Sequence, residues 1–186
     1  MISSRTRLIQ PTQKAARLIS ELYGNKMKRI TIDTNILPLD DIIVDVCKKN
    51  GYEYTVVSVT EREVEGSDFE KDIDDVPKIP ETAVWNESPW GNAVWPDKDN
   101  SFEEIIDIIS SGSFPKDRSN LTDAQKRMLR DAMILEAHVR EKRDIFITND
   151  KRAFINHGRR ERIENKFGTK ILTKTEFLEK YSNRVQ

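Results

Sequence analysis

The sequence has one cysteine, two histidines and no long hydrophobic run. A single cysteine, Cys47, excludes an intrachain disulfide and a thiolate metal cluster, and its place among apolar helix positions predicts a small core residue. No apolar run approaches the ~18 residues that a membrane span needs, and no signal peptide is recognisable. We therefore expect a cytoplasmic protein that does not enter a membrane.

The chain also lacks a large excess of charge of either sign, because its formal net charge is −1. The charges are unevenly distributed, however: residues 1–30 are basic, residues 61–107 are acidic and residues 140–170 are basic again. Such asymmetry permits a nucleic-acid partner without identifying one. The length of 186 residues suits one domain with a real core.

Apolar runs and helical patterns alternate along the chain. We expect strands at 28–32, 54–59, 145–147 and 169–172, and helices at 11–23, 41–50, 101–111, 122–140, 151–157 and 173–181. This order predicts an α/β fold, a three-layer α/β/α sandwich with a mainly parallel central sheet. Residues 1–27 would form a basic helical extension, residues 28–182 a single domain, and residues of about 67–120 a Trp-rich insertion within it. Inside that insertion, two short strands around Ser88-Pro89 would form a hairpin or an ordered loop.

The longest expected helix carries an acidic residue on its apolar face. Thr122 and Gln125 form a capping box at its start, as Ser101 and Glu104 would for the preceding helix. One face of the long helix is formed at steps of three and four residues by Ala124, Met128, Asp131, Leu135 and His138. A carboxylate among core-facing side chains is costly unless its charge is compensated. Asp131 is therefore a candidate functional residue.

Further acidic residues stand where expected strands end. Asp33 follows the strand at 28–32, Asp150 follows the strand at 145–147, and either Glu61 or Glu63 follows the strand at 54–59. Groups just beyond the carboxyl ends of parallel strands line the ligand crevice of such sheets. Carboxylates that lie close together need counter-charge, and Mg²⁺ or Mn²⁺ prefers oxygen ligands. The pattern predicts a divalent metal site, where a bland reading would make Asp33 and Asp150 helix caps.

These residues carry a resemblance to a known family. The segments Ile30-Thr31-Ile32-Asp33-Thr34-Asn35, Asp131-Ala-Met-Ile-Leu-Glu-Ala and Ile147-Thr148-Asn149-Asp150, with an acidic residue after Val-Ser-Val-Thr, resemble the PIN-domain nucleases over roughly 28–178. The resemblance implies a metal-dependent endoribonuclease that leaves 5′-phosphate and 3′-hydroxyl ends. It implies that Asp33, Asp131, Asp150 and one glutamate hold the Mg²⁺ or Mn²⁺. We assign that glutamate to Glu63, which an apolar residue follows as in the family pattern.

Other residues are expected to support this site. Thr148 and Asn35 are candidates for orienting the ligands or a water, although turn formation also explains Asn35. Arg152, Arg159 and Arg160 follow Asp150 closely and are candidates for holding phosphates of the RNA. His138 and His157 are expected to be structural. The expected partners are RNA, an antitoxin that masks the crevice if the nuclease is of the toxin type, and a second copy of the chain.

Three other functions compete with this one. A catalytically silent RNA- or protein-binding module would use the fold alone, and a structure-specific DNA nuclease would use the same acidic residues on another substrate. A phosphatase with a nucleophilic aspartate at Asp33 is disfavoured, because Asn35 stands where that class carries a second aspartate. The insertion adds Trp85, Trp90 and Trp95, which either stack on unpaired bases or anchor the loop to the core. We favour the anchoring role.

Overall fold

A computed structural model of the chain describes residues 27–85, 87–88, 93–96 and 100–182. The expected helix at 11–23, and with it nearly all of the basic extension at 1–27, lies outside these residues, as does Trp90. Within the described part, no helix combines the length and the apolar character needed to cross a membrane.

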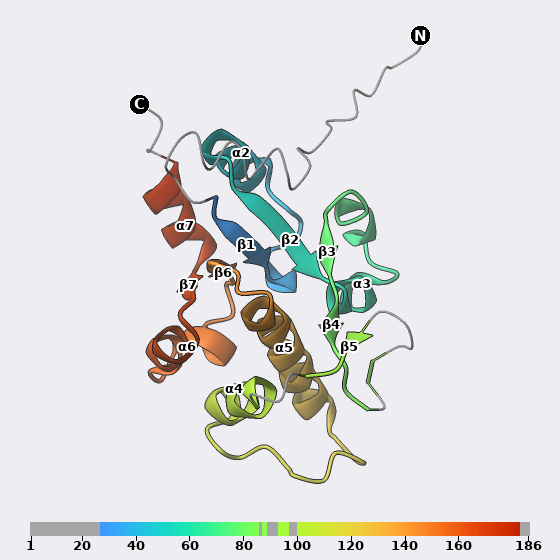
Figure 1. The fold of residues 1–186 in the computed structure, drawn as a ribbon. Coiled ribbons are helices and arrows are strands. Elements are labelled where there is room, and N and C mark those ends of the chain that lie inside the picture. Colours follow the sequence, from blue (N-terminus) through green and yellow to red (C-terminus); the bar gives the residue numbers. More distant parts are fainter. Residues whose placement is uncertain (1–26, 86, 89–92, 97–99, 183–186) are drawn as a thin grey trace.

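Five strands form one sheet in which every neighbouring pair is parallel (Figure 1). Its order is β3 (Lys78–Ile79), β2 (Glu53–Val57), β1 (Arg29–Ile32), β6 (Ile145–Ile147) and β7 (Lys170–Leu172). From the central β1 the chain builds towards β3 on one side and later returns to add β6 and β7 on the other. The expected α/β class with a parallel sheet is thus confirmed.

Helices cover both faces of this sheet. One face is covered by α2 (Asp41–Asn50) and α7 (Lys174–Tyr181), and the other by α4 (Ser101–Ser110), α5 (Asp123–Arg140) and α6 (Arg159–Phe167). Alternate strand residues enter the two cores: Ile145 and Ile147 pack with α2 and α7, whereas Phe146 packs with α4 and α5. This alternation follows from the two-residue period of a strand. The expected three layers are therefore present.

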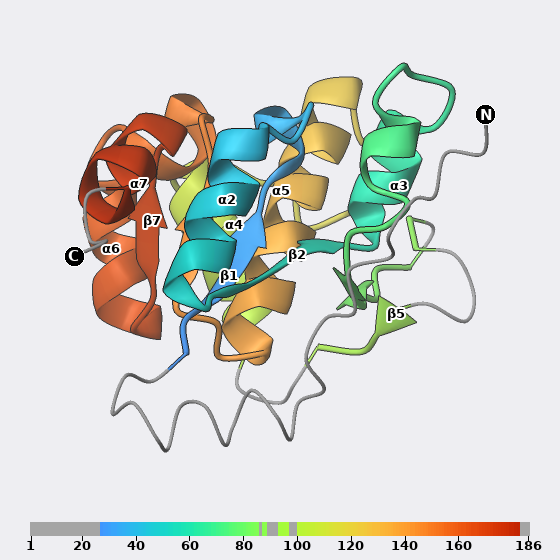
Figure 2. The same cartoon turned by 90° about the horizontal axis from the view of Figure 1, so that it is seen from above.

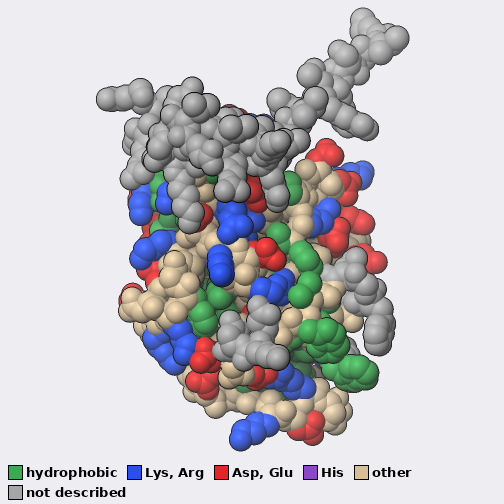
Figure 3. Space-filling model, in the orientation of Figure 1, with side chains coloured by type: hydrophobic (Ala, Val, Ile, Leu, Met, Phe, Trp, Pro, Cys, Tyr) green, Lys and Arg blue, Asp and Glu red, His purple; other side chains and the backbone are tan. Residues whose placement is uncertain are grey.

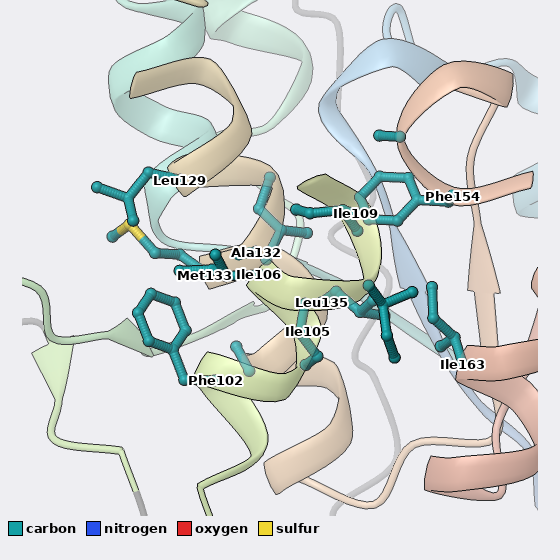
Figure 4. Packing of buried hydrophobic residues seen from close by; sticks show 14 of the residues in the cluster. Phe102, Ile105, Ile106, Ile109, Leu129, Ala132, Met133, Leu135, Phe154 and Ile163 are labelled. Atoms are coloured by element: carbon teal, nitrogen blue, oxygen red, sulfur yellow. The ribbon is translucent and has the colours of Figure 1, made fainter. Parts of the chain in front are cut away.

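The larger of the two cores lies between α4, α5 and the sheet (Figure 4). Its side chains are mostly aliphatic, with the aromatic rings of Phe102 from α4 and Phe154 after β6 closing the two sides. Fully burying one such side chain contributes about 1.5–3 kcal/mol to folding. The core thus fixes α5, the helix that carries Asp131, against the strands.

The predicted cap of α5 is confirmed, because Thr122 and Gln125 form the reciprocal capping box. The predicted apolar face is only partly right. Ala124 is exposed and Met128 is half-buried, but every residue from Ala132 to His138 is buried. The helix packs against α4, β2 and β4 (Glu81–Thr82), so the buried residues of its second half are not confined to one face.

Several local predictions are wrong. Ser101 does not cap α4: Asn100 occupies the cap position with a φ of 62°, and the Ser101 hydroxyl faces Glu136. The expected strand at 54–59 ends at Val57, because Val59 already begins α3 (Val59–Val64). The two strands of the insertion, β4 and β5 (Ala93–Val94), pair in parallel, which excludes a hairpin. The insertion also contains β3.

The expected helix at 151–157 is a single π-turn, η3 (Lys151–Ile155), and the longer α6 that follows Gly158 was not predicted. The α6 sequence is polar and only Ile163 of it is buried, so no apolar residues repeat at the helical spacing that would have predicted it. Two short 3₁₀ segments, η1 (Thr34–Ile36) and η2 (Glu70–Asp72), complete the described elements. Cys47 is buried, as expected, and burial raises the pKa of its thiol to about 12.

His138 is structural, as predicted. Its ring lies fully buried between the hydroxyls of Thr31 and Thr169, at 2.8 and 2.5 Å. Burial first, then the charges of Arg143 and Arg29, lower its pKa from 6.5 to about 3. The folded protein therefore keeps the ring neutral where the unfolded chain would already bind a proton.

We expect this histidine to make the fold sensitive to acid. Because its pKa is lowered on folding, stability is unaffected above pH 6.5 and is lost as the pH falls from 6.5 towards 3. By pH 5 the loss should reach about 2 kcal/mol. Urea unfolding of the wild type and of His138→Gln at pH 8 and pH 5 measures this loss as the difference in pH dependence. The exposed His157, changed to Gln, is the control; equal pH dependence of wild type and His138→Gln would contradict the prediction.

Candidate metal centre

The carboxyl ends of β1 and β6, the two strands at the middle of the sheet, are the place to look for a ligand site. From β1 the chain turns to β2 on one side, whereas β6 lies on the other side, so the direction of strand order switches between β1 and β6. Ile32 pairs with Ile147 at the ends of these strands, and the Asp33 N–H donates to the Ile147 carbonyl at 3.0 Å. Figure 2 shows this end of β1 between α2 and α5, with α3 nearby. A switch point of this kind is where α/β sheets bind ligands.

The Asp33 carboxylate is buried at this point and is held by two neighbours. Its Oδ2 accepts from the Thr148 hydroxyl at 2.6 Å and from the Asn35 amide at 2.5 Å. The Asn35 side chain in turn accepts from the N–H of Asn149 at 2.8 Å, which ties the loop after β1 to the loop after β6. The Asp33 side chain makes no capping hydrogen bond to η1. Thr148 and Asn35 therefore both hold the Asp33 carboxylate through hydrogen bonds.

Asp150 takes part in two sets of interactions. One carboxylate oxygen caps η3 by accepting from the Ala153 N–H at 2.7 Å, as the bland reading of this residue expected. Its own N–H donates to the Thr148 hydroxyl at 3.0 Å, so Thr148 connects Asp150 with Asp33. The negative charge of Asp150 also acts on Asp33 and Asp131. Capping uses one carboxylate oxygen and leaves the second for another ligand.

The four acidic residues form one electrostatic cluster, although they come from different elements. The pKa of Asp131 is raised to about 8, chiefly by burial and also by repulsion from Asp33, Asp150 and Glu63. Burial likewise raises the pKa of Asp33 to about 7, against the Thr148 hydrogen bond and with repulsion from Glu63 and Asp150. A shift this large through burial and like charges is typical of functional sites. The charge of Asp131 is thus coupled to those of the residues that follow β1 and β6.

The structure distinguishes the two candidate glutamates of α3. Glu61 is exposed and pairs with Lys78 at 3.2 Å. Glu63 is half-buried, accepts from the Thr34 hydroxyl at 2.5 Å, and has a pKa raised chiefly by burial. Since Thr34 directly follows Asp33, this hydrogen bond brings α3 to the end of β1. Glu63 is the glutamate that joins the cluster.

Two arginines and one glutamate at this site were not anticipated from the sequence. Arg127 and Arg130 on α5 offset the charges of Asp131 and Glu63, respectively. The Nε of Arg130 also pairs with Glu87 at 2.6 Å. The spacing could have predicted that Arg127 lies beside Asp131, because it comes one helical turn earlier on the same helix. Glu87 comes from the insertion, and no sequence signal pointed to it.

The three arginines expected to hold phosphates are placed differently from one another. Arg152 is exposed just after Asp150. Arg159 donates to the Arg152 carbonyl and to the Ser111 hydroxyl, and Arg160 pairs with Glu176 of α7 at 2.8 Å. Arg159 and Arg160 therefore connect α6 with Arg152, Ser111 and α7. Of the three, Arg152 is the one whose position leaves its charge available to a ligand.

The chemistry of the donors fits a hard cation. The four carboxylates supply oxygen atoms, the ligand type that Mg²⁺ and Mn²⁺ prefer, whereas Thr148 and Asn35 act on Asp33 as hydrogen-bond donors. Their positions are not those of a closed ligand cage: in the part of the chain that the structure describes, no three Asp, Glu, His or Cys side chains are grouped so that they could hold a metal ion. Asp33, Glu63 and Asp150 instead each accept from a local protein donor. Magnesium usually keeps several waters and few direct protein ligands.

The comparisons with known proteins add no relative. The chain matches no protein-family model, no curated protein and no solved structure. The functional conclusion therefore depends on the geometry and charge of the acidic cluster.

Proposed function

We propose that the chain is a divalent-metal-dependent endoribonuclease with a PIN-like fold. The observation that supports the proposal is that the charges of Glu63 and Asp150 act on both Asp33 and Asp131, near the switch point of a parallel sheet. Burial and repulsion together hold the pKa values of Asp33 and Asp131 far above their ordinary range. Positive charge at this point would relieve that repulsion, and phosphodiester hydrolysis is a reaction that uses such a carboxylate-bound cation.

Each residue has a role in this proposal. Asp33, Asp131, Asp150 and Glu63 would hold Mg²⁺ or Mn²⁺, which supplies charge stabilisation at the phosphate and activates water when it is bound. Thr148 and Asn35 fix the rotamer of Asp33 through their hydrogen bonds at 2.6 and 2.5 Å. Thr34 does the same for Glu63. Loss of such an orienting partner typically costs 10- to 100-fold in metal affinity or activity, roughly the effect we expect for Thr148→Val.

RNA as the substrate, a cytoplasmic location and control by an antitoxin belong to the same proposal. The RNA substrate and the antitoxin follow from the resemblance of the four acidic segments to PIN-domain nucleases, whereas the location is the expectation drawn from the sequence composition. A DNA substrate is the alternative that a direct comparison of RNA and DNA cleavage would detect.

The test uses the two glutamates of α3 as a matched pair. With single-stranded RNA and Mn²⁺, Glu63→Gln and Asp33→Asn should each lower the cleavage rate by roughly a thousandfold, since each removes several kcal/mol of metal-dependent stabilisation. Glu61→Gln, on the same helix but exposed and paired with Lys78, should cleave like the wild type. RNA degradation at one rate by all four proteins would mean a contaminating nuclease and would remove the support for this function.

A second candidate is the catalytically silent binding module. The observation in its favour is that the described carboxylates do not stand in a metal-holding group. Thermal unfolding with and without Mn²⁺ separates the two functions, because a ligand that binds the native state raises the melting temperature. A rise that Asp33→Asn abolishes supports the nuclease. No rise at millimolar Mn²⁺ supports the silent module.

A further inference from the structure

Two tryptophans of the insertion are exposed, against the anchoring role expected for them. The exposed fractions are 69% for Trp85 and 64% for Trp95. Tryptophan is ordinarily highly buried, and exposed large apolar side chains that occur together mark interaction surfaces. Hydrophobic side chains gather on this face of the molecule beside β4 and β5 (Figure 3). The core therefore does not explain these two residues.

The parallel pairing of β4 and β5 places the two tryptophans at the same end of the strand pair. Glu81 pairs with Ala93 and Thr82 pairs with Val94, and both strands run in the same direction. Trp95 directly follows β5, and Trp85 comes three residues after the end of β4, so both leave the strand pair at its carboxyl end. The Ala-Val-Trp repeat in the sequence thus becomes two indoles on one side of the pair.

Both indoles line one groove, which we call the Trp groove. It has a volume of about 370 Å³, within the range of small-ligand sites. Its walls also include Phe102, Arg118, Ser119 and Glu103, whose carboxylate oxygens accept from Arg118 at 2.9 and 2.7 Å. The Arg118 guanidinium lies 5.7 Å from the ring centres of Phe102 and Phe114, where it presents a planar cation next to the aromatic surface.

The Trp groove is connected to the acidic cluster. Glu87 lies two residues after Trp85, and its carboxylate pairs with Arg130 at 2.6 Å. Arg130 in turn offsets the charge of Glu63. Because two residues span at most about 7 Å, the groove, Arg130 and the acidic cluster follow one another along a short path. A chain of nucleotides could follow the same path.

We propose that the Trp groove binds unpaired bases of the RNA whose phosphate lies at the acidic cluster. This inference rests on the proposed function and adds a separate subsite, in the insertion, for the bases of that RNA. Indole faces stack on any base, and each such contact is worth about 1–3 kcal/mol. The groove lies near the acidic cluster, to which Glu87 and Arg130 link it, and this position favours a nucleotide over an apolar protein segment.

The experiment measures binding without cleavage. In the Asp33→Asn background, without added divalent metal, we follow the fluorescence anisotropy of labelled oligouridylate and of an abasic oligoribonucleotide of equal length. Trp85→Ala and Trp95→Ala should each weaken oligouridylate binding by about tenfold, which corresponds to 1.4 kcal/mol. Binding of the abasic strand should not change. Phe69→Ala, which removes another exposed aromatic ring outside the groove, is the matched control.

Two further variants keep the test decisive if an alanine variant does not fold. Trp95→Phe retains a stacking face and should bind almost as the parent does, whereas Trp95→Leu retains apolar bulk and should lose affinity. Equal binding by the Phe and Leu variants would overturn the proposal. Dimerisation that Trp95→Ala abolishes would assign the groove to a second copy of the chain and would overturn it as well.

Failure of this inference and failure of the nuclease function give different results. If the tryptophan variants bind RNA normally while the wild type still cleaves RNA with Mn²⁺, the groove proposal is wrong and the nuclease stands. If the wild type does not cleave but binds oligouridylate through the tryptophans, the groove is supported and the nuclease is not.

Discussion

Replacing Asp131 by asparagine should raise the melting temperature of the metal-free protein by about 5 °C at pH 8, while it removes RNA cleavage. The physical reason is that the wild-type carboxylate is ionised at a cost, being half-buried and repelled by Asp33, Asp150 and Glu63. Asparagine keeps the shape and removes the charge. We expect a gain of about 1–2 kcal/mol, well below what the full pKa shift implies, because solvent partly screens the side chain.

Metal should reverse the order of stability. Mn²⁺ stabilises the native state of the wild type by mass action, and the variant lacks one of the charges that attract the ion. Differential scanning calorimetry with EDTA and with Mn²⁺ measures both effects. Asp45→Asn, an exposed change of the same type on α2, should alter neither melting temperature. An Asp131→Asn protein less stable than the wild type in EDTA would show that the carboxylate has a structural role and does not belong to a strained metal site.

This expected gain in stability explains why Asp131 could be recognised from the sequence. A charged residue in an apolar helical pattern breaks the local rule for the fold, and such breaks concentrate at functional sites. Asp33 and Asp150 were found by their place after buried strands, because parallel strands deliver their carboxyl ends to one edge. The strand pattern alone left Glu63 and Glu61 open, and only the family resemblance favoured Glu63, since the choice depends on how α3 turns towards Thr34 and Lys78.

The parts of the fold that the sequence predicted are those with strong local signals. β1, β6, α2, α5 and α7 have buried apolar runs or capping residues, and they occur close to the expected positions. α6 has a single buried side chain, and β4 and β5 have two residues each, so tertiary contacts decide them. β4 packs against α5, a contact between distant segments that no short-range pattern encodes. For the same reason the exposure of Trp85 and Trp95 could not be foreseen.

Arg140→Met should be the most destabilising of the substitutions proposed for this protein, at about 3–5 kcal/mol. Arg140 pairs with the fully buried Glu136 at 2.9 Å and donates to the carbonyl of Pro80 at 2.5 Å. Without the guanidinium, the buried Glu136 loses the positive charge that this pair supplies. Urea unfolding at pH 7 measures the loss, and oligouridylate binding should weaken too, because Arg140 attaches the start of β4 to α5.

Two controls identify the buried charge as the cause. In the Arg140→Met background, Glu136→Gln removes the buried carboxylate and should recover about 1–3 kcal/mol, since much of the loss comes from leaving one partner ionised in the core. Lys166→Met breaks the more exposed pair with Glu104 and should cost no more than about 1 kcal/mol. If the double variant were no more stable than Arg140→Met alone, the loss would come from the bonds to β4, and the insertion would depend on Arg140 as a hydrogen-bond donor more than as a charge.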